Sequence, residues 1–262
     1  MAGKSVRLEI MRQDTPSSHS YWEEFELQWR PGMNVISALM EIALNPVTVR
    51  GKHTAPIVYD SNCLEEVCGS CAMLINGQAA MACSSLLDKL EQPIRLEPLS
   101  RFPVVRDLSV DRSVLFENLK RIHAWVPIDG TYDLGPGPRI DPSIQQQSYP
   151  MSRCMSCCLC MEVCPQFNES THFVGAAIIN QVRLFNLHPT GAHLRHERLE
   201  AMMGEGGIHE CSYAQNCVQI CPKNIPLTAS ISIVNGQTIR QAIGDFFQRP
   251  ELTSPNKAPG RR

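Results

Sequence analysis

The chain has 262 residues, a formal net charge of −2 and 12 cysteines. With so little net charge and no dense run of Lys or Arg, nothing in its electrostatics favours a nucleic-acid partner. No segment approaches the roughly 20 apolar residues of a membrane-spanning helix. Residues 1–13 include Glu9 and lack both the apolar core of a secretory signal and the Arg-rich pattern of a transit peptide. We therefore expect any membrane span to belong to another subunit.

The N-terminal third is predicted to form a small α+β unit. Val6–Met11 and Phe25–Trp29 alternate apolar and polar side chains, which is the period of a half-buried strand. A helix is predicted over Asn34–Leu44, because apolar side chains repeat there at helical spacing after an Asn, a favoured N-cap residue. A strand and a helix of these lengths suit a sheet with one covering helix.

A hairpin and a last strand complete this unit. Cys71–Ile75 and Gln78–Cys83 flank Asn76-Gly77, the dipeptide that is typical of a tight primed turn. Ile94–Leu96 is predicted to be the closing strand. The resulting order of elements is two strands, a helix, a cysteine-bearing loop, a hairpin and a strand.

The rest of the chain is predicted to be helical. Ser113–Trp125 has apolar side chains on one side, and a loop rich in Gly and Pro follows over Pro127–Pro138. Further helices are expected near Val174–Leu187, His196–Met203 and Leu227–Phe247. The prediction is a domain of residues 1–110 followed by an all-helical domain of residues 111–262.

The cysteines fall into three groups, which span Cys63–Cys83, Cys154–Cys164 and Cys211–Cys221. A chain without an export signal is expected in a reducing compartment, where stable disulfides are rare. Clustered cysteines in that setting indicate metal ligation before disulfide bonding.

The first group has the spacing of a plant-type [2Fe–2S] site. Cys63, Cys68 and Cys71 are separated by four and two residues, and Cys83 follows on the far strand of the predicted hairpin. The alternative is structural zinc, whose ligands usually come as two closely spaced pairs. Cys63/Cys68 and Cys71/Cys83 fit such pairs badly, so a [2Fe–2S] site is predicted.

The second group is a complete bacterial-ferredoxin run, Cys154-x2-Cys157-x2-Cys160-x3-Cys164-Pro165. In two-cluster proteins the fourth cysteine of such a run ligates the other cluster. The partner run ends at Cys221-Pro222, and the same spacing counted backwards finds Cys217, Ala214 and Cys211. The crossing rule then gives two ligand sets, which are Cys154, Cys157, Cys160 and Cys221 for [4Fe–4S], and Cys164, Cys211 and Cys217 for [3Fe–4S].

Ala214 and Cys158 are the two irregular positions of these runs. Ala214 stands where a fourth thiolate would hold the last iron, which is why the second site is predicted to be [3Fe–4S]. Cys158 is left over. Placing it among the ligands instead of Cys157 would break both flanking two-residue gaps, so it is predicted to be a buried thiol that binds no metal.

The chain resembles the iron–sulfur subunits of succinate dehydrogenase and fumarate reductase. The resemblance covers nearly the whole chain and includes, beyond the cysteines, the stretches Arg50–Cys71, Phe102–Asp111, Ala124–Pro138 and Asn216–Pro222. It implies an N-terminal β-grasp, plant-type [2Fe–2S] ferredoxin domain and a C-terminal all-helical, bacterial-type domain with [4Fe–4S] and [3Fe–4S] clusters.

The resemblance also implies partners and a place in the cell. FAD, with succinate as its substrate, belongs to a flavoprotein subunit, and haem belongs to an integral-membrane anchor. The chain would relay electrons between FAD and a quinone from the cytoplasmic face of a bacterial cell membrane, as a peripheral subunit. The likeness is closest to the bacterial branch that uses menaquinone. Fumarate reductase, working in the opposite direction, and a free-standing multi-cluster ferredoxin are the alternatives.

The quinone site of family members that reduce ubiquinone is not carried over. Those members have a Trp pair after the residue matching Pro165 and a His after the residue matching Cys211, whereas this chain has Gln166-Phe167-Asn168 and Ser212. Pro165, Gln166, Ser212 and Tyr213 either line a different quinone pocket or only pack around the cluster. Both interpretations stay open at this point.

Overall fold

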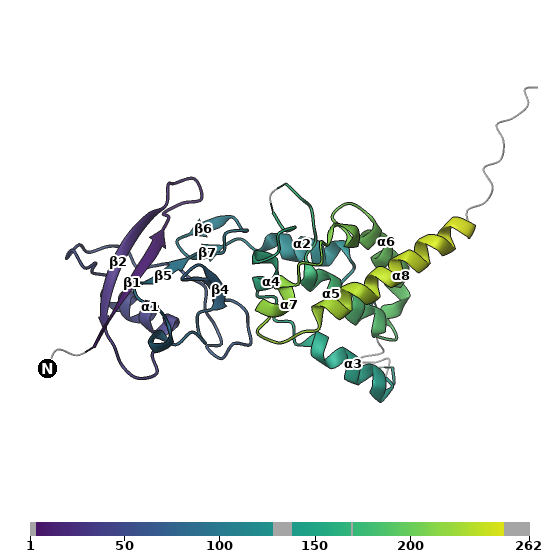
Figure 1. Ribbon diagram of the computed structural model, residues 1–262, viewed down its shortest axis with the longest axis horizontal. Coiled ribbons are helices and arrows are strands. Elements are labelled where there is room, and N and C mark those ends of the chain that lie inside the picture. The colour runs from purple at the N-terminus through teal and green to yellow at the C-terminus, as the bar shows by residue number, and fades with distance from the viewer. Residues whose placement is uncertain (1–3, 128–137, 169, 249–262) are drawn as a thin grey trace, which may run out of the picture.

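The computed structural model describes residues 4–127, 138–168 and 170–248, and it divides them between a β-rich part and a helical part (Figure 1). Most of the predicted loop over Pro127–Pro138 lies outside the described residues. The predicted α+β class, with a ferredoxin-like sheet followed by helices, is confirmed.

The β-rich part is a five-stranded mixed sheet with the strand order β2-β1-β5-β3-β4. The central strands β1 and β5 are parallel, and the other neighbouring pairs are antiparallel. Asn76 and Gly77 have φ of 50° and 74°, so the predicted primed turn joins β3 to β4. The strands are β1 (Ser5–Arg12), β2 (Tyr21–Gln28), β3 (Ala72–Ile75), β4 (Gln78–Met81) and β5 (Ile94–Glu97).

Helix α1 (Val35–Leu44) covers one face of this sheet and is capped as its sequence predicts. The Ser37 amide donates to Asn34 Oδ1 at 2.8 Å, and the Asn34 amide donates to Ser37 Oγ at 2.9 Å, which forms a reciprocal capping box. The buried side of α1 packs in one core with the inward side chains of β1, namely Val6, Leu8 and Ile10. The cysteine-bearing loop connects α1 to β3, and its two ends are therefore held by the packed sheet and helix.

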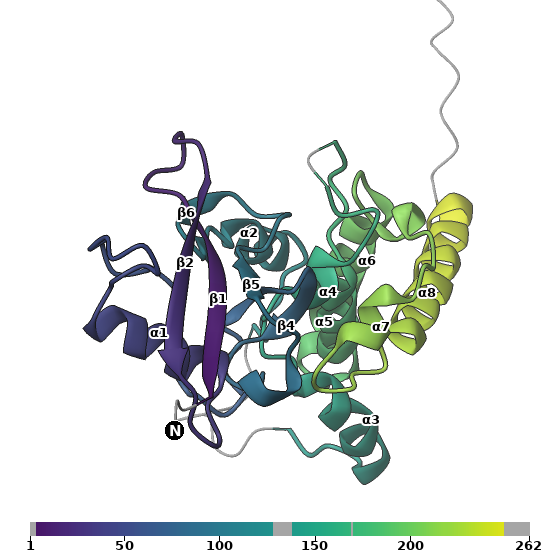
Figure 2. The ribbon, with the colours of Figure 1, turned by 60° about the vertical axis from the view of Figure 1, so that its left-hand side comes forward.

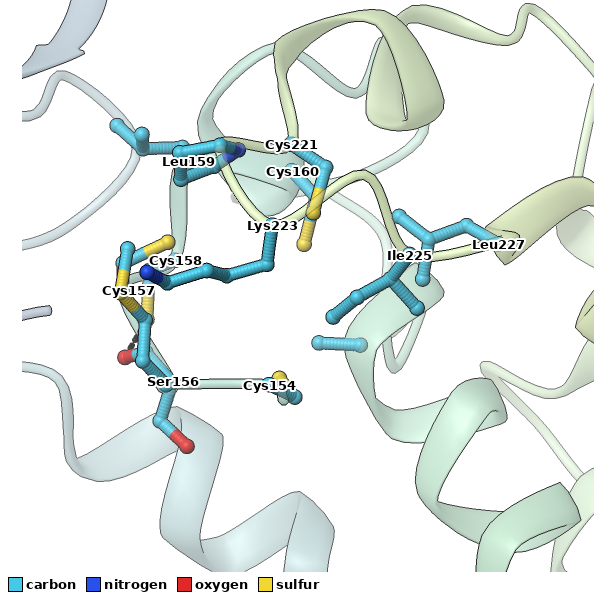
Figure 3. A pocket seen from close by; sticks show the side chains of 13 residues that line it. Cys154, Ser156, Cys157, Cys158, Leu159, Cys160, Cys221, Lys223, Ile225 and Leu227 are labelled. Carbon is cyan, nitrogen blue, oxygen red and sulfur yellow. Dashed lines mark hydrogen bonds between the residues drawn. The ribbon is translucent and has the colours of Figure 1, made fainter. Parts of the chain in front are cut away.

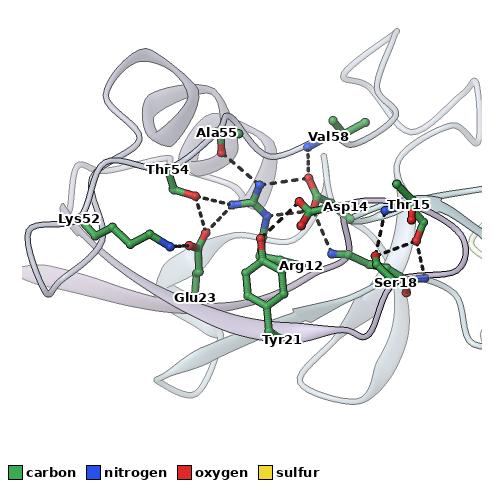
Figure 4. Close-up of polar contacts among 12 residues, drawn as sticks. Arg12, Asp14, Thr15, Ser18, Tyr21, Glu23, Lys52, Thr54, Ala55 and Val58 are labelled. Atoms are coloured by element: carbon green, nitrogen blue, oxygen red, sulfur yellow. Dashed lines mark hydrogen bonds and ion pairs between the residues drawn. The ribbon is translucent and has the colours of Figure 1, made fainter.

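The inward face of β1 ends in a buried ionic cluster around Arg12 (Figure 4). Arg12 Nε lies 2.9 Å from Asp107 Oδ1, and its Nη1 contacts the Glu23 carboxylate. Asp107 Oδ2 also accepts from the Val58 amide at 2.9 Å. Because buried charges are tolerated only when they are paired, the cluster fixes the segment that leads to Cys63 onto the sheet.

Asp107 forms the turn of a short hairpin of β6 (Val104–Arg106) and β7 (Ser109–Val110) that the sequence did not predict. Its φ of 47° is left-handed, and its carboxylate stabilises the turn by accepting a hydrogen bond from Arg12. The hairpin leads into the helical part.

Helix α5 is the centre of the helical part, and α8 lies on the side away from the sheet (Figure 2). Ile178, Ile179 and Val182 of α5 are fully buried, and Ser230 of α8 donates to the buried Asn180 Oδ1 at 3.1 Å. None of the helices in the described residues is both long and apolar enough to cross a membrane. The helices are α2 (Ser113–Arg121), α3 (Pro142–Ser152), α4 (Leu159–Glu162), α5 (Ala176–Leu187), α6 (Arg195–Met203), α7 (Asn216–Ile220) and α8 (Leu227–Gln248).

Helix α2 ends at Arg121, four residues before the predicted end at Trp125. His123 has a left-handed φ of 51° and its ring stacks on Trp125. The buried guanidinium of Arg198 donates to the carbonyl oxygens of His123 and Trp125, both at 3.0 Å. Arg198 of α6 thus satisfies two carbonyl oxygens of the left-handed turn that follows α2. The predicted helices near 174–187, 196–203 and 227–247 correspond to α5, α6 and α8.

Candidate iron–sulfur sites

The first cysteine group gathers at the open end of the β3–β4 hairpin, opposite its turn. Cys71 just before β3 and Cys83 shortly after β4 are both buried there, where the Ala82 amide donates to the Cys71 carbonyl at 3.0 Å. Burial and the hydrogen bond with the Cys83 thiol raise the pKa of Cys71 to about 12. Hydrogen bonds from Ser70 and from the Cys63 backbone lower the pKa of Cys68 to about 6. The charge of Cys68 also contributes to raising the pKa of Cys71, so the four cysteines lie close together.

The loop between Cys63 and Cys68 directs backbone amides at sulfur. Leu64 and Glu66 have φ of 62° and 56°, and this alternation turns the amides of Glu65 and Val67 inward. Both amides donate to Cys63 Sγ, at 3.5 and 3.4 Å. Such donors favour the thiolate over the thiol and stabilise negative charge at a bound cluster.

The second group lines a pocket that Leu227, the first residue of α8, also lines (Figure 3). Cys154, Cys157 and Cys160 reach it from the first run, and Cys221 reaches it from the second, so the structure brings together all four residues of this predicted set. Burial is the main cause that raises the pKa of Cys157 to about 11 and that of Cys160 well above its ordinary value.

The third group, Cys164, Cys211 and Cys217, lines a separate pocket. Burial, and after it the negative charge of Cys164, raises the pKa of Cys217, and Cys164 acts on Cys211 in the same sense. The structure therefore brings this predicted set of three cysteines together as well. The other lining residues include Pro165, Ser212, Tyr213 and Ala214.

Gln166 is the one residue of the predicted quinone set that does not line this pocket. It lies half-buried, and its carbonyl oxygen accepts a hydrogen bond from the Thr171 hydroxyl. Ser212 and Tyr213 are exposed, and the Tyr213 hydroxyl lies 3.3 Å from Asn235 Nδ2 of α8. The rim of the third site therefore opens to the surface beside α8.

The two runs share one backbone path. In the first run the residues flanking Cys157, Ser156 and Cys158, have φ of 54° and 67°, and α4 begins at the next residue. In the second run the residues flanking Ala214, Tyr213 and Gln215, have φ of 56° and 64°, and α7 begins at the next residue. Ala214 thus occupies the place of Cys157.

Cys158 corresponds in this path to Gln215, the residue just before α7. Its side chain is 2% exposed, and its Sγ lies 3.6 Å from the carbonyl oxygen of Ser156 in its own loop. Burial raises the pKa of Cys158 to about 12. Cys158 borders the second site, but its thiol is held by the backbone next to it.

Only thiols form the three donor sets, and this matches iron–sulfur clusters, which are held mainly by Cys thiolates. Across the described residues, the three cysteine sets included, no group of three or more His, Cys, Asp or Glu side chains is placed to hold a single metal ion, whereas a cluster spreads its thiolate ligands over several irons. Two of the cysteine sets each line one pocket, and the other set has amides directed at sulfur. The residues present therefore fit the clusters that the sequence predicts.

The fold and these sites define a two-domain iron–sulfur protein of the electron-transfer class. Residues 7–117 match a family described as a 2Fe-2S iron-sulfur cluster binding domain, and residues 150–225 match a 4Fe-4S dicluster domain. The chain is 57% identical to the succinate dehydrogenase iron-sulfur subunit of Bacillus subtilis, over 93% of this chain and 96% of that protein. The chain belongs to the family of succinate dehydrogenase iron–sulfur subunits.

Two further comparisons extend this result. The fumarate reductase iron-sulfur subunit of Wolinella succinogenes is 28% identical, over 90% of this chain and 98% of that protein. A chain of the Mycobacterium smegmatis Sdh1 complex in the apo form matches with a TM-score of 0.76 and 22% identity, covering 96% of this chain and all of that chain. At that identity the structural likeness shows the fold alone.

Proposed function

We propose that this chain relays electrons from the FAD of a flavoprotein subunit to a quinone at an integral-membrane anchor, with succinate oxidation as the physiological direction. The chain would work as a peripheral subunit on the cytoplasmic side of a bacterial cell membrane. One observation carries the proposal: eleven of the twelve cysteines form three groups that follow one another through the fold.

The proposed ligands are the three predicted cysteine sets. Domain 1–110 would hold the first set and domain 111–262 the other two. When bound, the clusters supply one-electron transfer, and the protein sets their positions and potentials. The sets are Cys63, Cys68, Cys71 and Cys83 for [2Fe–2S]; Cys154, Cys157, Cys160 and Cys221 for [4Fe–4S]; and Cys164, Cys211 and Cys217 for [3Fe–4S].

The order of the sites supports a relay. Gly69, next to Cys68, packs against the backbone of Met155 and Cys157, so the first site adjoins the second. Cys160 lies in the single turn of α4 and Cys164 two residues beyond its end, so the second site adjoins the third. Electrons that enter at the sheet would leave at the exposed rim of the third site.

The connection between the two parts is further supported by Glu162 of α4. Its buried carboxylate accepts from the backbone amides of Ser100 and Arg101, both at 3.0 Å. Hydrogen bonds to a charged group are stronger than neutral ones. They would keep the sheet and the cysteine run in a fixed relation while electrons pass.

We place the quinone end of the relay at the rim formed by Pro165, Ser212 and Tyr213, with Gln166 next to Pro165 in the chain. Menaquinone is the proposed quinone, because the Trp pair and the His of ubiquinone-reducing members are replaced here. Haem, if the anchor carries it, belongs to that partner.

Fumarate reductase is the second candidate function, because a 28% identical relative has that name. The test is to purify the complex and compare its rates of succinate oxidation and fumarate reduction with menaquinone analogues. Faster succinate oxidation supports the proposal, and faster fumarate reduction favours the alternative. A brown chain with about nine irons that co-purifies with no flavoprotein would instead identify a free-standing ferredoxin.

A further inference from the structure

The first two cysteine sites meet in a backbone contact at Gly69. A Cβ at this position would lie 2.4 Å from the carbonyl oxygen of Met155 and 3.0 Å from the amide nitrogen of Cys157. Gly69 also has a left-handed φ of 77°. Only glycine satisfies both conditions, so the loop next to Cys68 lies directly on the loop between Cys154 and Cys157.

Arg112 holds one side of this contact. Its guanidinium donates from Nη1 to the Gly69 carbonyl oxygen and from Nη2 to the Ser70 carbonyl oxygen, both at 2.8 Å. Arg112 stands just before α2, which belongs to the helical part, whereas both acceptors belong to the first cysteine loop. The planar fork of a guanidinium can bind two adjacent carbonyls in this way, but the single nitrogen of lysine cannot reproduce it.

Arg112 also acts on the other side of the contact. The Gly69 residue that it binds packs against the amide nitrogen of Cys157, so the guanidinium also lies near the second cysteine group. One half-buried cation therefore binds the loop of the first site and lies within electrostatic range of the second. A charge in such a position interacts more strongly than one in bulk water.

We propose that Arg112 is the positioning residue of the junction between the first two cluster sites: it clamps the Gly69–Ser70 backbone against Met155–Cys157 and places a positive charge between the sites. The inference rests on the proposed electron relay. A positive charge favours the more negative, reduced state of a neighbouring redox group, so Arg112 raises the reduction potentials at both sites.

The test uses the whole purified complex and two readouts other than turnover. Redox titration followed by EPR gives the potentials of the [2Fe–2S] and [4Fe–4S] sites, and the broadening and relaxation of their signals give the magnetic coupling between them. Arg112→Gln should shift both potentials downward and weaken the coupling. Arg112→Lys should leave both reduction potentials near their wild-type values but weaken the magnetic coupling, because lysine retains the positive charge without the planar fork.

Two glycine variants separate the contact from the charge. Gly69→Ala should weaken the coupling with Arg112 still in place. Gly51→Ala is the matched control, since Gly51 has a similar φ of 75° but no atom within 4 Å of a Cβ there. Arg7→Gln removes an exposed guanidinium from β1 and should leave both readouts at their wild-type values.

Wild-type potentials and coupling in an Arg112→Gln complex with full iron content would overturn the proposal. If Arg112→Gln does not assemble, Arg112→Lys and Gly69→Ala decide the question: reduced coupling in both supports the clamp, and unchanged coupling in both overturns it. A wild-type complex without the two EPR signals would contradict the proposed relay itself, which is a distinguishable failure.

Discussion

The loop from Cys154 to Cys160 and the loop from Cys211 to Cys217 follow the same backbone path but differ at the middle position. The first loop has Cys157 there and the second has Ala214, and in both the residues on each side are left-handed. Each loop then enters a short helix that leads to the last cysteine of its run. The comparison indicates that one side chain on a common scaffold decides how many thiolates each site offers.

Cys157→Ala is expected to have the largest effect on this comparison, because it makes the first loop like the second. The site would keep three thiolates, from Cys154, Cys160 and Cys221. We expect loss of the [4Fe–4S] signal, and about one iron fewer per chain if a three-iron cluster forms in its place. Iron and acid-labile sulfide analysis with EPR of the reduced complex measures this. A full [4Fe–4S] signal in this variant would show that Cys157 is not a ligand.

Ala214→Cys makes the opposite change and is expected to have the next largest effect. The new thiol would stand at the position that Cys157 occupies in the first loop, so the third site should convert toward [4Fe–4S]. The oxidised [3Fe–4S] EPR signal should then fall, and about one iron per chain should be gained. Ala214→Ser is the control, since a hydroxyl of similar size is a poorer iron ligand than a thiolate. An undiminished [3Fe–4S] signal in Ala214→Cys complexes would mean that Ala214 does not face the open corner.

Cys158→Ala is expected to have the smallest effect and makes a matched pair with Cys157→Ala at the neighbouring position. Cys158 is buried, and its thiol is hydrogen-bonded to the Ser156 carbonyl oxygen of its own loop. Replacing it by Ala should therefore remove packing contacts but no iron ligand. The expected cost is about 1 kcal/mol of unfolding free energy, with all three cluster signals retained. Thermal unfolding and EPR of the variant complex measure both quantities. Loss of the [4Fe–4S] signal would assign Cys158 to the ligand set.

The cysteine groups could be predicted from the sequence because their spacing is local. Three ligands of the first site, three of the second and two of the third lie within a few residues of one another, so the chain has little freedom in how they meet. The exchange of Cys164 and Cys221 between the two runs is predicted from their repeated spacing. The capping box is also a local feature, because Asn34 and Ser37 are only three residues apart.

The features that sequence reasoning missed all depend on distant partners. Arg12 looks like the polar end of a strand, but it is buried because Asp107, far along the chain, meets it. The same contact explains the unpredicted hairpin of β6 and β7. Helix α2 ends before Trp125 at a left-handed His123, in a turn whose carbonyl oxygens Arg198 of α6 binds. Helix α3 had a local signal, since Asp141 caps it and Pro142 follows at the first helical position, and that signal was overlooked.

The central claim is that the third site has three thiolates where the second has four. EPR of the oxidised native complex, prepared without oxygen, tests it most directly, because an oxidised [3Fe–4S] cluster is paramagnetic whereas oxidised [2Fe–2S] and [4Fe–4S] clusters of the ferredoxin type are not. We predict a [3Fe–4S] signal of about one spin per chain. A silent spectrum from complexes with their full iron content would contradict the account.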